Sequence, residues 1–255
     1  MTTTTTPIRK AAEIGFGIEI EANIPVTHRA DFPAGSYHHG RQVNLEIMDG
    51  WTAQKDGSVI AGGEFFPVEI VSPVLHGEDG LVQVVMMLDY LASIGAKVNS
   101  SCGLHVHVDC QNVDIRRIVT LFKKYEMAFY DLNGELVNRR LESRYCKPSD
   151  KWTGDRYASL NLAHANDRHP HVEIRVWQGA MKPETVVAAI YMAVSLVSRA
   201  SAPEIVTTSD VATKPTQLMS QYIQRFMVGE CMIVGDYQPG DIWQEMMKAA
   251  GRSSR

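Results

Sequence analysis

Three short segments of this chain alternate apolar residues with ionisable ones, and this pattern restricts the fold more than any other feature of the sequence. They are residues 17–21 (GIEIE), 103–109 (GLHVHVD) and 172–176 (VEIRV). Successive side chains of a β-strand point to opposite faces, so each segment would place Ile, Leu and Val on one face and Glu, His, Asp or Arg on the other. The pattern predicts a sheet with one face in the core and the other lined by ionisable groups.

The remaining signals favour an antiparallel sheet covered by helices. The first strand is expected over residues 13–24, and a strand over 65–73 would add Glu69 to the ionisable face. Between these strands, Asp-Gly turns at 49–50 and 56–57 predict hairpins. Apolar residues at helical spacing predict helices over residues 79–94, 114–130 and 183–197, followed by two shorter helices.

Composition describes an ordinary globular chain. Its 255 residues, 45% of them hydrophobic, suffice for one large domain. We therefore expect a disordered tail over residues 1–7 and a single domain over 8–255, with a helical C-terminal part at about 183–250. The formal net charge of -4 lacks the basic excess of a general nucleic-acid binder, so no nucleic-acid partner is expected.

The cysteines and the N-terminus predict a cytoplasmic protein. The four cysteines form no CxxC pair, which favours reduced thiols over a disulfide framework or a structural zinc site. The N-terminus lacks the basic start and apolar core of a signal peptide. No apolar run is expected to approach the ~20 residues of a membrane span, so no membrane partner is expected.

The carboxylates of the ionisable face need cationic partners, because burying an unpaired carboxylate costs several kcal/mol. The glutamates concerned are Glu19, Glu21, Glu69 and Glu173. Hard carboxylate oxygens suit Mg²⁺, or Mn²⁺ where an imidazole lies beside them. A polar segment over residues 139–171 contains Arg139, Arg140, Arg144, Arg156 and Arg168 and suits a loop over an anionic ligand. Divalent ions facing arginines predict a polyphosphate substrate, for which ATP is the natural candidate.

The ordered motifs GFGIEIE, a Trp with DGS downstream, VEIVSP, CGLHVHVD, RYASLN and VEIRVWQGA resemble the amidoligase family, relatives of glutamine synthetase and glutamate-cysteine ligase. The resemblance runs from about residue 15 to 180. It implies an α+β fold in which an antiparallel sheet curves into a funnel, with ATP and divalent ions inside and helices on the outer face. It also implies an enzyme that phosphorylates a carboxylate with ATP and lets an amine displace the phosphate, giving an amide or isopeptide bond, ADP and phosphate.

The same resemblance implies roles for individual residues. The implied metal ligands are Glu19, Glu21, Glu69, His105 and Glu173. The implied catalytic residues are Glu69, Arg156 and Arg175, of which Arg175 would steady the transferring phosphoryl group. The implied nucleotide contacts are Ser72, His105, Asn161 and Arg175. Asp56 and His107 are assigned to the pocket without a role, and the departures at Cys102 and Ala180 leave the substrate end open.

Other interpretations stay open at the level of sequence. Glu19 and Glu21 could form the solvated edge of an amphipathic strand, His107 could orient a neighbour instead of binding a metal, and Arg175 could pair only with Glu173. A metal-dependent hydrolase that uses the two histidines and a noncatalytic nucleotide or metal-binding module are the alternative functions. For a ligase, the expected substrates are a small-molecule or peptide carboxylate and an amine, whose identities the sequence does not specify.

Overall fold

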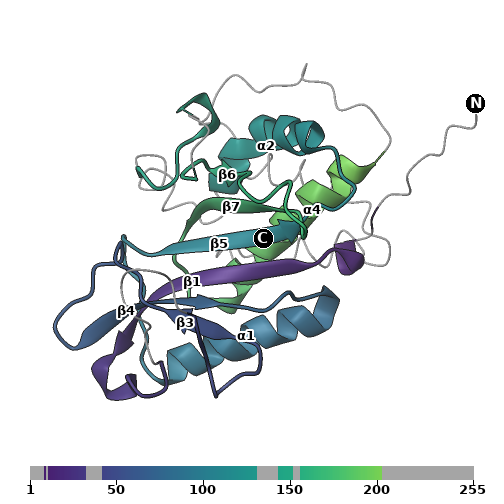
Figure 1. The fold of residues 1–255 in the computed structure, drawn as a ribbon. Helices are drawn as coiled ribbons and strands as arrows, with labels where there is room; N and C mark the ends of the chain where they lie inside the picture. Colours follow the sequence, from purple (N-terminus) through teal and green to yellow (C-terminus); the bar gives the residue numbers. More distant parts are fainter. Residues whose placement is uncertain (1–8, 10, 33–41, 131–142, 152–155, 203–255) are drawn as a thin grey trace, which may run out of the picture.

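A seven-stranded sheet forms the centre of the part of the molecule that the computed structural model describes, residues 9, 11–32, 42–130, 143–151 and 156–202 (Figure 1). Its strands are β1 (Phe16–Pro25), β2 (Val43–Asn44), β3 (Thr52–Gln54), β4 (Phe65–Val71), β5 (Gly103–Asp109), β6 (Leu160–Asn161) and β7 (His171–Gln178). They are ordered β2-β3-β4-β1-β5-β7-β6, and every neighbouring pair is antiparallel. The four segments that carry the predicted ionisable residues are therefore the adjacent strands β4, β1, β5 and β7.

The register of these strands places their ionisable residues side by side. The facing pairs are Glu19 with His105, Glu21 with Glu69, and His107 with Glu173. The pairing of β5 with β7 shifts between Leu104 and Val106, where the ladder is irregular. Because a one-residue slip would send every side chain to the opposite face, this register is what brings carboxylates and imidazoles together.

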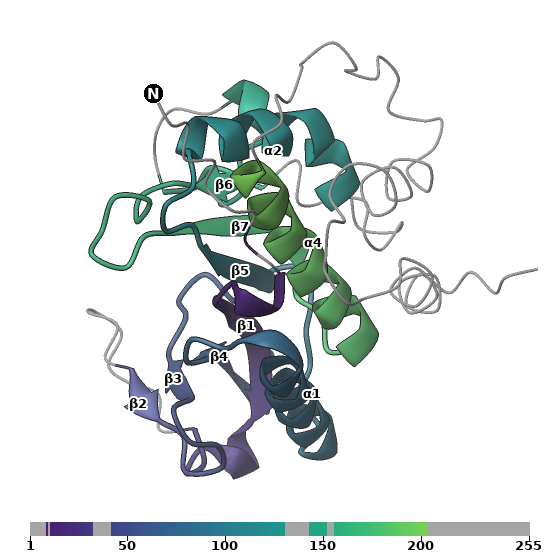
Figure 2. The same ribbon diagram turned by 90° about the vertical axis from the view of Figure 1, so that its right-hand side faces the viewer.

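The helices cover the apolar face of the sheet. They are α1 (Gly77–Ser93), α2 (Ile115–Tyr130) and α4 (Pro183–Ser201), and Figure 2 shows them on one side of the sheet; short 3-10 turns are η1 (Ala11–Glu13), η2 (Val26–His28) and η3 (Ser149–Lys151). Ile18, Ile20, Leu104, Val106 and Ile174 point into this interface and are fully buried. The alternation read from the sequence thus separates a packed face from an ionisable face.

Helix α4 corrects one expectation. Pro183–Ser201 is long and apolar enough to cross a membrane by length and composition, although no apolar run of that length was expected. Of its apolar window, 72% is buried inside the protein. A helix that is apolar nearly all round fits the core of a globular protein, and α4 packs against α1, α2 and β5.

The predicted α+β class, an antiparallel sheet with helices on one face, is confirmed. Two element boundaries also agree with their signals: the Asp114 carboxylate accepts the Arg116 N–H at 2.9 Å before α2, and Gly95 takes a φ of +76° where α1 ends. The first strand begins at Phe16 and not at residue 13, because residues 11–13 form η1. The tail over 1–7 and the two helices expected after residue 201 lie outside the described residues, and the single domain stays a prediction.

Candidate active site

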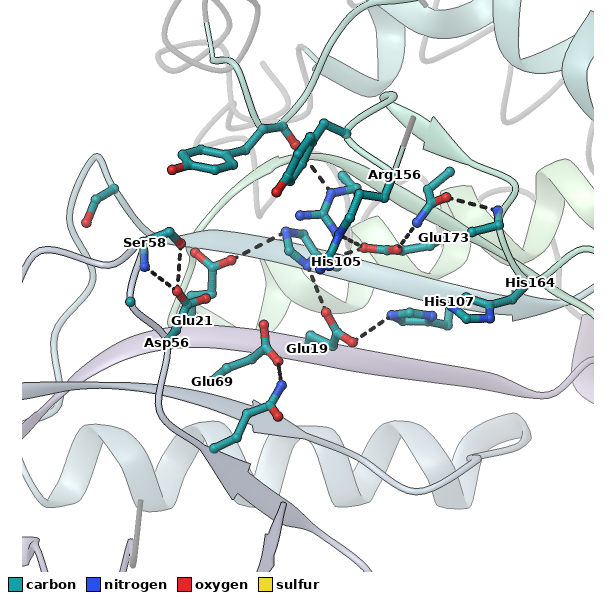
Figure 3. A pocket seen from close by; sticks show the side chains of 18 of the residues that line it. Glu19, Glu21, Asp56, Ser58, Glu69, His105, His107, Arg156, His164 and Glu173 are labelled. Atoms are coloured by element: carbon teal, nitrogen blue, oxygen red, sulfur yellow. Dashed lines mark hydrogen bonds and ion pairs between the residues drawn. The ribbon is translucent and has the colours of Figure 1, made fainter. Parts of the chain in front are cut away.

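A cavity of about 630 Å³ opens on the ionisable face of the sheet (Figure 3). Its lining includes every sequence-predicted site residue except Ser72, namely Glu19, Glu21, Glu69, His105, Arg156, Asn161, Glu173 and Arg175, together with Asp56 and His107. Arg139 and Arg140, which belonged to the predicted basic segment, lie outside the described residues. Glu21 is buried on the central strand β1, so the solvated-edge interpretation does not hold for Glu21.

Glu19 is the centre of this cavity because it contacts both histidines of β5. Its Oε2 lies 2.9 Å from His105 Nδ1, and its Oε1 lies 3.1 Å from His107 Nε2. Burial disfavours the charged carboxylate, but the contacts with His105 and His107 outweigh it and hold the pKa of Glu19 well below its ordinary value. Burial likewise disfavours the imidazolium of His107, yet Glu19 raises the pKa of His107. Glu19 is therefore a fixed negative charge.

Glu69 has the opposite electrostatic character. Burial, with the nearby charge of Glu19, raises the pKa of Glu69 to about 8, although the Gln54 side-chain amide donates a hydrogen bond to it. Across the strands, Glu21 accepts the Gly103 backbone N–H at 2.6 Å. Burial and the neighbouring carboxylates thus favour the neutral form of Glu69, and a divalent cation bound beside it would favour the charged form.

Glu173 and Arg175 form the opposite wall on β7. The Arg175 guanidinium pairs with Glu173 Oε1, while the Asn161 amide donates to Glu173 Oε2 at 2.7 Å. The Nε of Arg175 also donates to the Tyr145 carbonyl at 3.3 Å. Burial opposes ionisation of Glu173, but the charges of His105 and Arg175 lower its pKa. The predicted pairing of Arg175 with Glu173 is present, and the guanidinium still lines the cavity.

Three groups of side chains in this cavity could each hold a metal ion, with ligand atoms within 4.8 Å of one another. They are Glu19–His107–Glu173, Glu19–Glu69–His105 and Glu21–Asp56–Glu69. Together the groups contain five carboxylates and two imidazoles, a set of ligands that fits Mg²⁺ or Mn²⁺ better than a metal that prefers thiolates. All five predicted ligands occur in these groups. Asp56 and His107, which the resemblance assigned to the pocket without a role, join them.

A second cavity of about 370 Å³ adjoins the first and shares Glu19 and His107 with it. The sequence analysis did not predict this second cavity. Gly15 and Gly17 precede Glu19 at two-residue spacing and so lie on the same face, where they have no side chains to fill the space. Pro73, Pro170 and His171 form further walls, so the lining is mainly apolar.

Ser72 lines this second cavity and not the first. Its hydroxyl accepts the Ile18 backbone N–H at 2.9 Å and donates to the Pro73 carbonyl at 2.8 Å. The structure therefore gives Ser72 a role in joining β1 to the end of β4, and its nucleotide contact stays a prediction.

Cys102 beside the site is a packing residue. It is fully buried, and a Cβ added to Gly179 would lie 2.5 Å from the Cys102 Cβ. Burial raises the pKa of the Cys102 thiol, which disfavours the thiolate that a nucleophile needs.

The antiparallel sheet thus presents clustered carboxylates, two imidazoles and an arginine in one cavity, an arrangement that could hold metal ions. The family model described as "Putative amidoligase enzyme" matches residues 12–153, more than half of the chain. The chain therefore belongs to this amidoligase family.

No curated protein matches the chain. Among solved structures, the crystal structure of the complex between prokaryotic ubiquitin-like protein Pup and its ligase PafA contains a chain similar to it, with 11% identity and a TM-score of 0.49. The similarity covers 95% of this chain and 66% of that chain, slightly less than two thirds of its length.

Proposed function

We propose that the protein is an ATP-dependent carboxylate-amine ligase that forms an amide or isopeptide bond through an acyl phosphate and releases ADP and phosphate. The observation that carries the proposal is the pairing of the two cavities around Glu19 and His107. The first cavity suits a metal-bound polyanion, and the second suits a flat, weakly polar group. A nucleoside triphosphate joins these two chemistries in one molecule.

The metal ligands of the proposed enzyme are Glu19, Glu21, Glu69, His105 and Glu173. When bound, Mg²⁺ or Mn²⁺ would neutralise phosphate oxygens and orient the transferring group. Arg175, held by Glu173 and by the Tyr145 carbonyl, would stabilise the negative charge that develops during phosphoryl transfer. Asn161 fixes the second oxygen of Glu173 and so supports this arrangement.

Asp56 is suited to the amine substrate. Its Oδ1 accepts the Ser58 backbone N–H at 2.5 Å and the Ser58 hydroxyl at 2.7 Å, which fixes the carboxylate at the cavity wall. We assign it the binding of the ammonium form of the amine and the acceptance of its proton. The neutral amine then attacks the acyl phosphate, the new C–N bond forms, and the C–O bond to phosphate breaks.

A metal-dependent hydrolase is the second candidate, favoured by the two histidines of β5. Barrel hydrolases place their ligands at the ends of parallel strands, whereas these ligands lie along antiparallel ones. A hydrolase would also have no use for the second cavity. A noncatalytic module would not need Arg175 beside the carboxylates.

The proposed location is the cytoplasm, where ATP is available. Among the described cysteines, Cys102 and Cys110 are free thiols, which supports a reducing compartment. The proposed substrates are small-molecule or peptide carboxylates and amines.

Trapping of the acyl phosphate tests the proposed function. With Mg²⁺, ATP and hydroxylamine, a screen of carboxylic acids should yield a hydroxamate and ADP in equal amounts. Glu19→Gln and Glu173→Gln should each lower turnover by about a hundredfold or more, because loss even of a group that only orients a metal ligand costs roughly 10- to 100-fold. Glu64→Gln, a change at an exposed carboxylate outside the cavity, should turn over like the wild type. ATP binding that does not require a divalent ion would contradict the proposal.

A further inference from the structure

Asp56 lies on a loop whose tip is exposed. The loop covers residues 55–64, between β3 and β4, and Asp56 and Ser58 line the first cavity. Figure 3 shows these two side chains at one end of the cavity. Ile60 is 72% exposed, and a Cβ at Gly62 would meet nothing within 4 Å, so these residues give the loop little packing. The position of Asp56 therefore depends on the other contacts that hold the loop.

Two polar side chains of a turn that is distant in sequence hold the tip of this loop. The Ile60 backbone N–H donates to Ser101 Oγ at 2.8 Å, and the Asn99 side-chain amide donates to the Ile60 carbonyl at 2.7 Å. The Ser101 hydroxyl in turn donates to Asn99 Oδ1 at 2.6 Å. These three bonds form a closed ring, which fixes the orientation of the Asn99 amide. We call the side chains of Asn99 and Ser101 the latch.

The latch also connects the loop to two strands that form the first cavity. The Asn99 carbonyl accepts the side-chain amide of Gln178, the last residue of β7, at 3.2 Å. It also accepts the backbone N–H of Cys102, just before β5, at 3.1 Å. Ser101 itself lines the first cavity. The latch thus places the loop of Asp56 relative to the strands that carry the metal ligands and Arg175.

The bonds of the latch lie at the surface, where water competes for them. Asn99 is exposed, and so are both of its partners' bonds with Ile60 and Ser101. A hydrogen bond that exchanges with water shifts an equilibrium by roughly 2- to 10-fold. Loss of one member of the latch should therefore be enough to open the loop measurably without unfolding the protein.

We propose that Asn99 and Ser101 are positioning residues for the amine substrate, because they hold the loop so that Asp56 meets the amine at the cavity wall. This inference rests on the proposed ligase function, in which Asp56 binds the amine and accepts its proton. An open loop must close before Asp56 can bind the amine, so the apparent affinity falls in proportion to the fraction of molecules whose loop is closed. The latch therefore sets the KM for the amine, and saturating amine restores kcat.

Hydroxylamine serves as the amine probe, together with the acid that yields hydroxamate in the trapping screen. Asn99→Ala removes one bond to Ile60 and the acceptor of Ser101, so it should raise the KM for hydroxylamine by about 5- to 50-fold. The kcat and the KM for Mg-ATP should stay within about twofold of the wild type. Ser101→Ala should raise the KM for hydroxylamine by roughly 2- to 10-fold, whereas Ser101→Thr keeps the hydroxyl and should restore the wild-type value.

Hydrogen exchange of the full chain tests the latch without any need for turnover. Residues 55–64 should exchange about tenfold faster in Asn99→Ala than in the wild type, because the loop opens more often. Ser100→Ala is the matched control. Ser100 is exposed, lies between the two latch residues and lines neither cavity, so this variant should keep the wild-type exchange and KM. Unfolding midpoints establish that all variants are folded.

Three results would overturn the inference. Unchanged exchange in Asn99→Ala would show that the latch does not hold the loop. Faster exchange with an unchanged KM for hydroxylamine would show that the loop does not position the amine. Equal increases in the KM for hydroxylamine and for Mg-ATP would indicate a general disturbance of the cavity.

Failure of the ligase function is a different result. If the wild type yields no hydroxamate with any acid of the screen, the ligase function fails and the role of the latch in amine binding fails with it. Exchange of residues 55–64 still decides whether the latch holds the loop. If the wild type yields hydroxamate and the latch variants keep its KM for hydroxylamine, the ligase function stands and only the positioning role fails.

Discussion

At the scale of single residues, the site is a set of carboxylates that the fold drives to opposite protonation states. Contacts with His105 and His107 keep Glu19 ionised, whereas burial and the charge of Glu19 raise the pKa of Glu69 to about 8. The protonated form of Glu69 lets two crowded carboxyl groups coexist without a cation. Binding of a divalent cation must remove that proton, so metal binding and protonation compete.

Metal affinity should therefore rise with pH. Between about pH 6 and pH 8 the apparent affinity for Mn²⁺ should increase by up to tenfold per pH unit and then level off above the pKa of Glu69. Calorimetry in buffers of different ionisation enthalpy should show release of about one proton per bound ion at pH 6.5. Glu69→Gln, which cannot release a proton, should bind more weakly and with a flatter pH profile. A pH-independent wild-type affinity would exclude this coupling.

The same shift has a consequence for the metal-free protein. A carboxyl whose pKa is raised on folding contributes stability that is fully present below its ordinary pKa of 4.5 and is lost as pH rises through about 8. Urea unfolding of the metal-free wild type should thus show a free energy of unfolding that declines from neutral pH towards pH 8, relative to Glu69→Gln.

At the scale of secondary-structure elements, the loop that carries Tyr145 and Tyr157 depends on helix α2. Glu126 is buried at 7% exposure, and Ser149 and Ser159 both donate to it. Burial raises the pKa of Glu126, while the serine hydrogen bonds oppose that shift. The helix therefore supplies a polar anchor to both described pieces of this segment, residues 143–151 and 156–159.

Removal of this anchor should loosen the cavity wall that Tyr145 and Tyr157 form. Glu126→Ala leaves the Ser149 N–H and two hydroxyls without their acceptor and should lower the free energy of unfolding by about 1–3 kcal/mol. Glu126→Gln keeps the size and one acceptor, so it should cost less. Both variants should raise KM for the acyl substrate more than they change the affinity for nucleotide. The increase in KM should be larger for Glu126→Ala than for Glu126→Gln. An equal loss in both affinities would indicate a general structural role.

The sequence was sufficient to predict which side chains lie on each face of a strand, but not which residues they face on the neighbouring strands. Alternation in residues 17–21 and 103–109 predicted that Glu19 and His105 leave the core face, because side-chain direction is a local property of a strand. That Glu21 faces Glu69 depends on the register between β1 and β4, which is set by contacts far apart in sequence.

Short or irregular elements could not be predicted either, because they too depend on contacts between residues far apart in sequence. Strand β6, with only Leu160 and Asn161, has no periodicity to detect and exists because β7 supplies its pairing partner. The second cavity needed both the bare strand face at Gly17 and the approach of Pro170 from another segment. Ser72 was recognised by its motif, but only the structure shows that its hydroxyl bonds to backbone groups.

At the scale of the whole molecule, the sheet separates two binding functions along one strand. Along β1, Glu21 and Glu19 line the first cavity, and Gly17, with Gly15 just before the strand, lines the second. Glu19 is common to both, so a ligand bound in one cavity adjoins a ligand bound in the other. This division predicts that metal binding and nucleotide binding can be changed separately.

Gly17→Val should separate them. A Cβ at Gly17 would have its nearest neighbours at 3.6 Å (Ser72 Oγ) and 3.8 Å (the Pro73 carbonyl), ordinary contacts, and Gly17 does not have a positive φ, so the strand should tolerate the change. The added methyl groups would enter the second cavity and weaken Mg-ATP binding by about tenfold or more. Mn²⁺ affinity without nucleotide should stay within about twofold of wild type, because the ligand groups on Glu19 and His105 are untouched.

Gly62→Val is the control for this prediction, since a Cβ at Gly62 would meet nothing within 4 Å and Gly62 lies outside both cavities. It should leave both affinities unchanged. Calorimetry with Mn²⁺ alone and then with Mg-ATP measures the two steps on the same samples. If Gly17→Val weakened metal and nucleotide binding equally, the two cavities would act as one site. If Gly17→Val bound nucleotide as tightly as the wild type, the adenine base of ATP would not occupy the second cavity, and this cavity would not belong to the proposed ATP site.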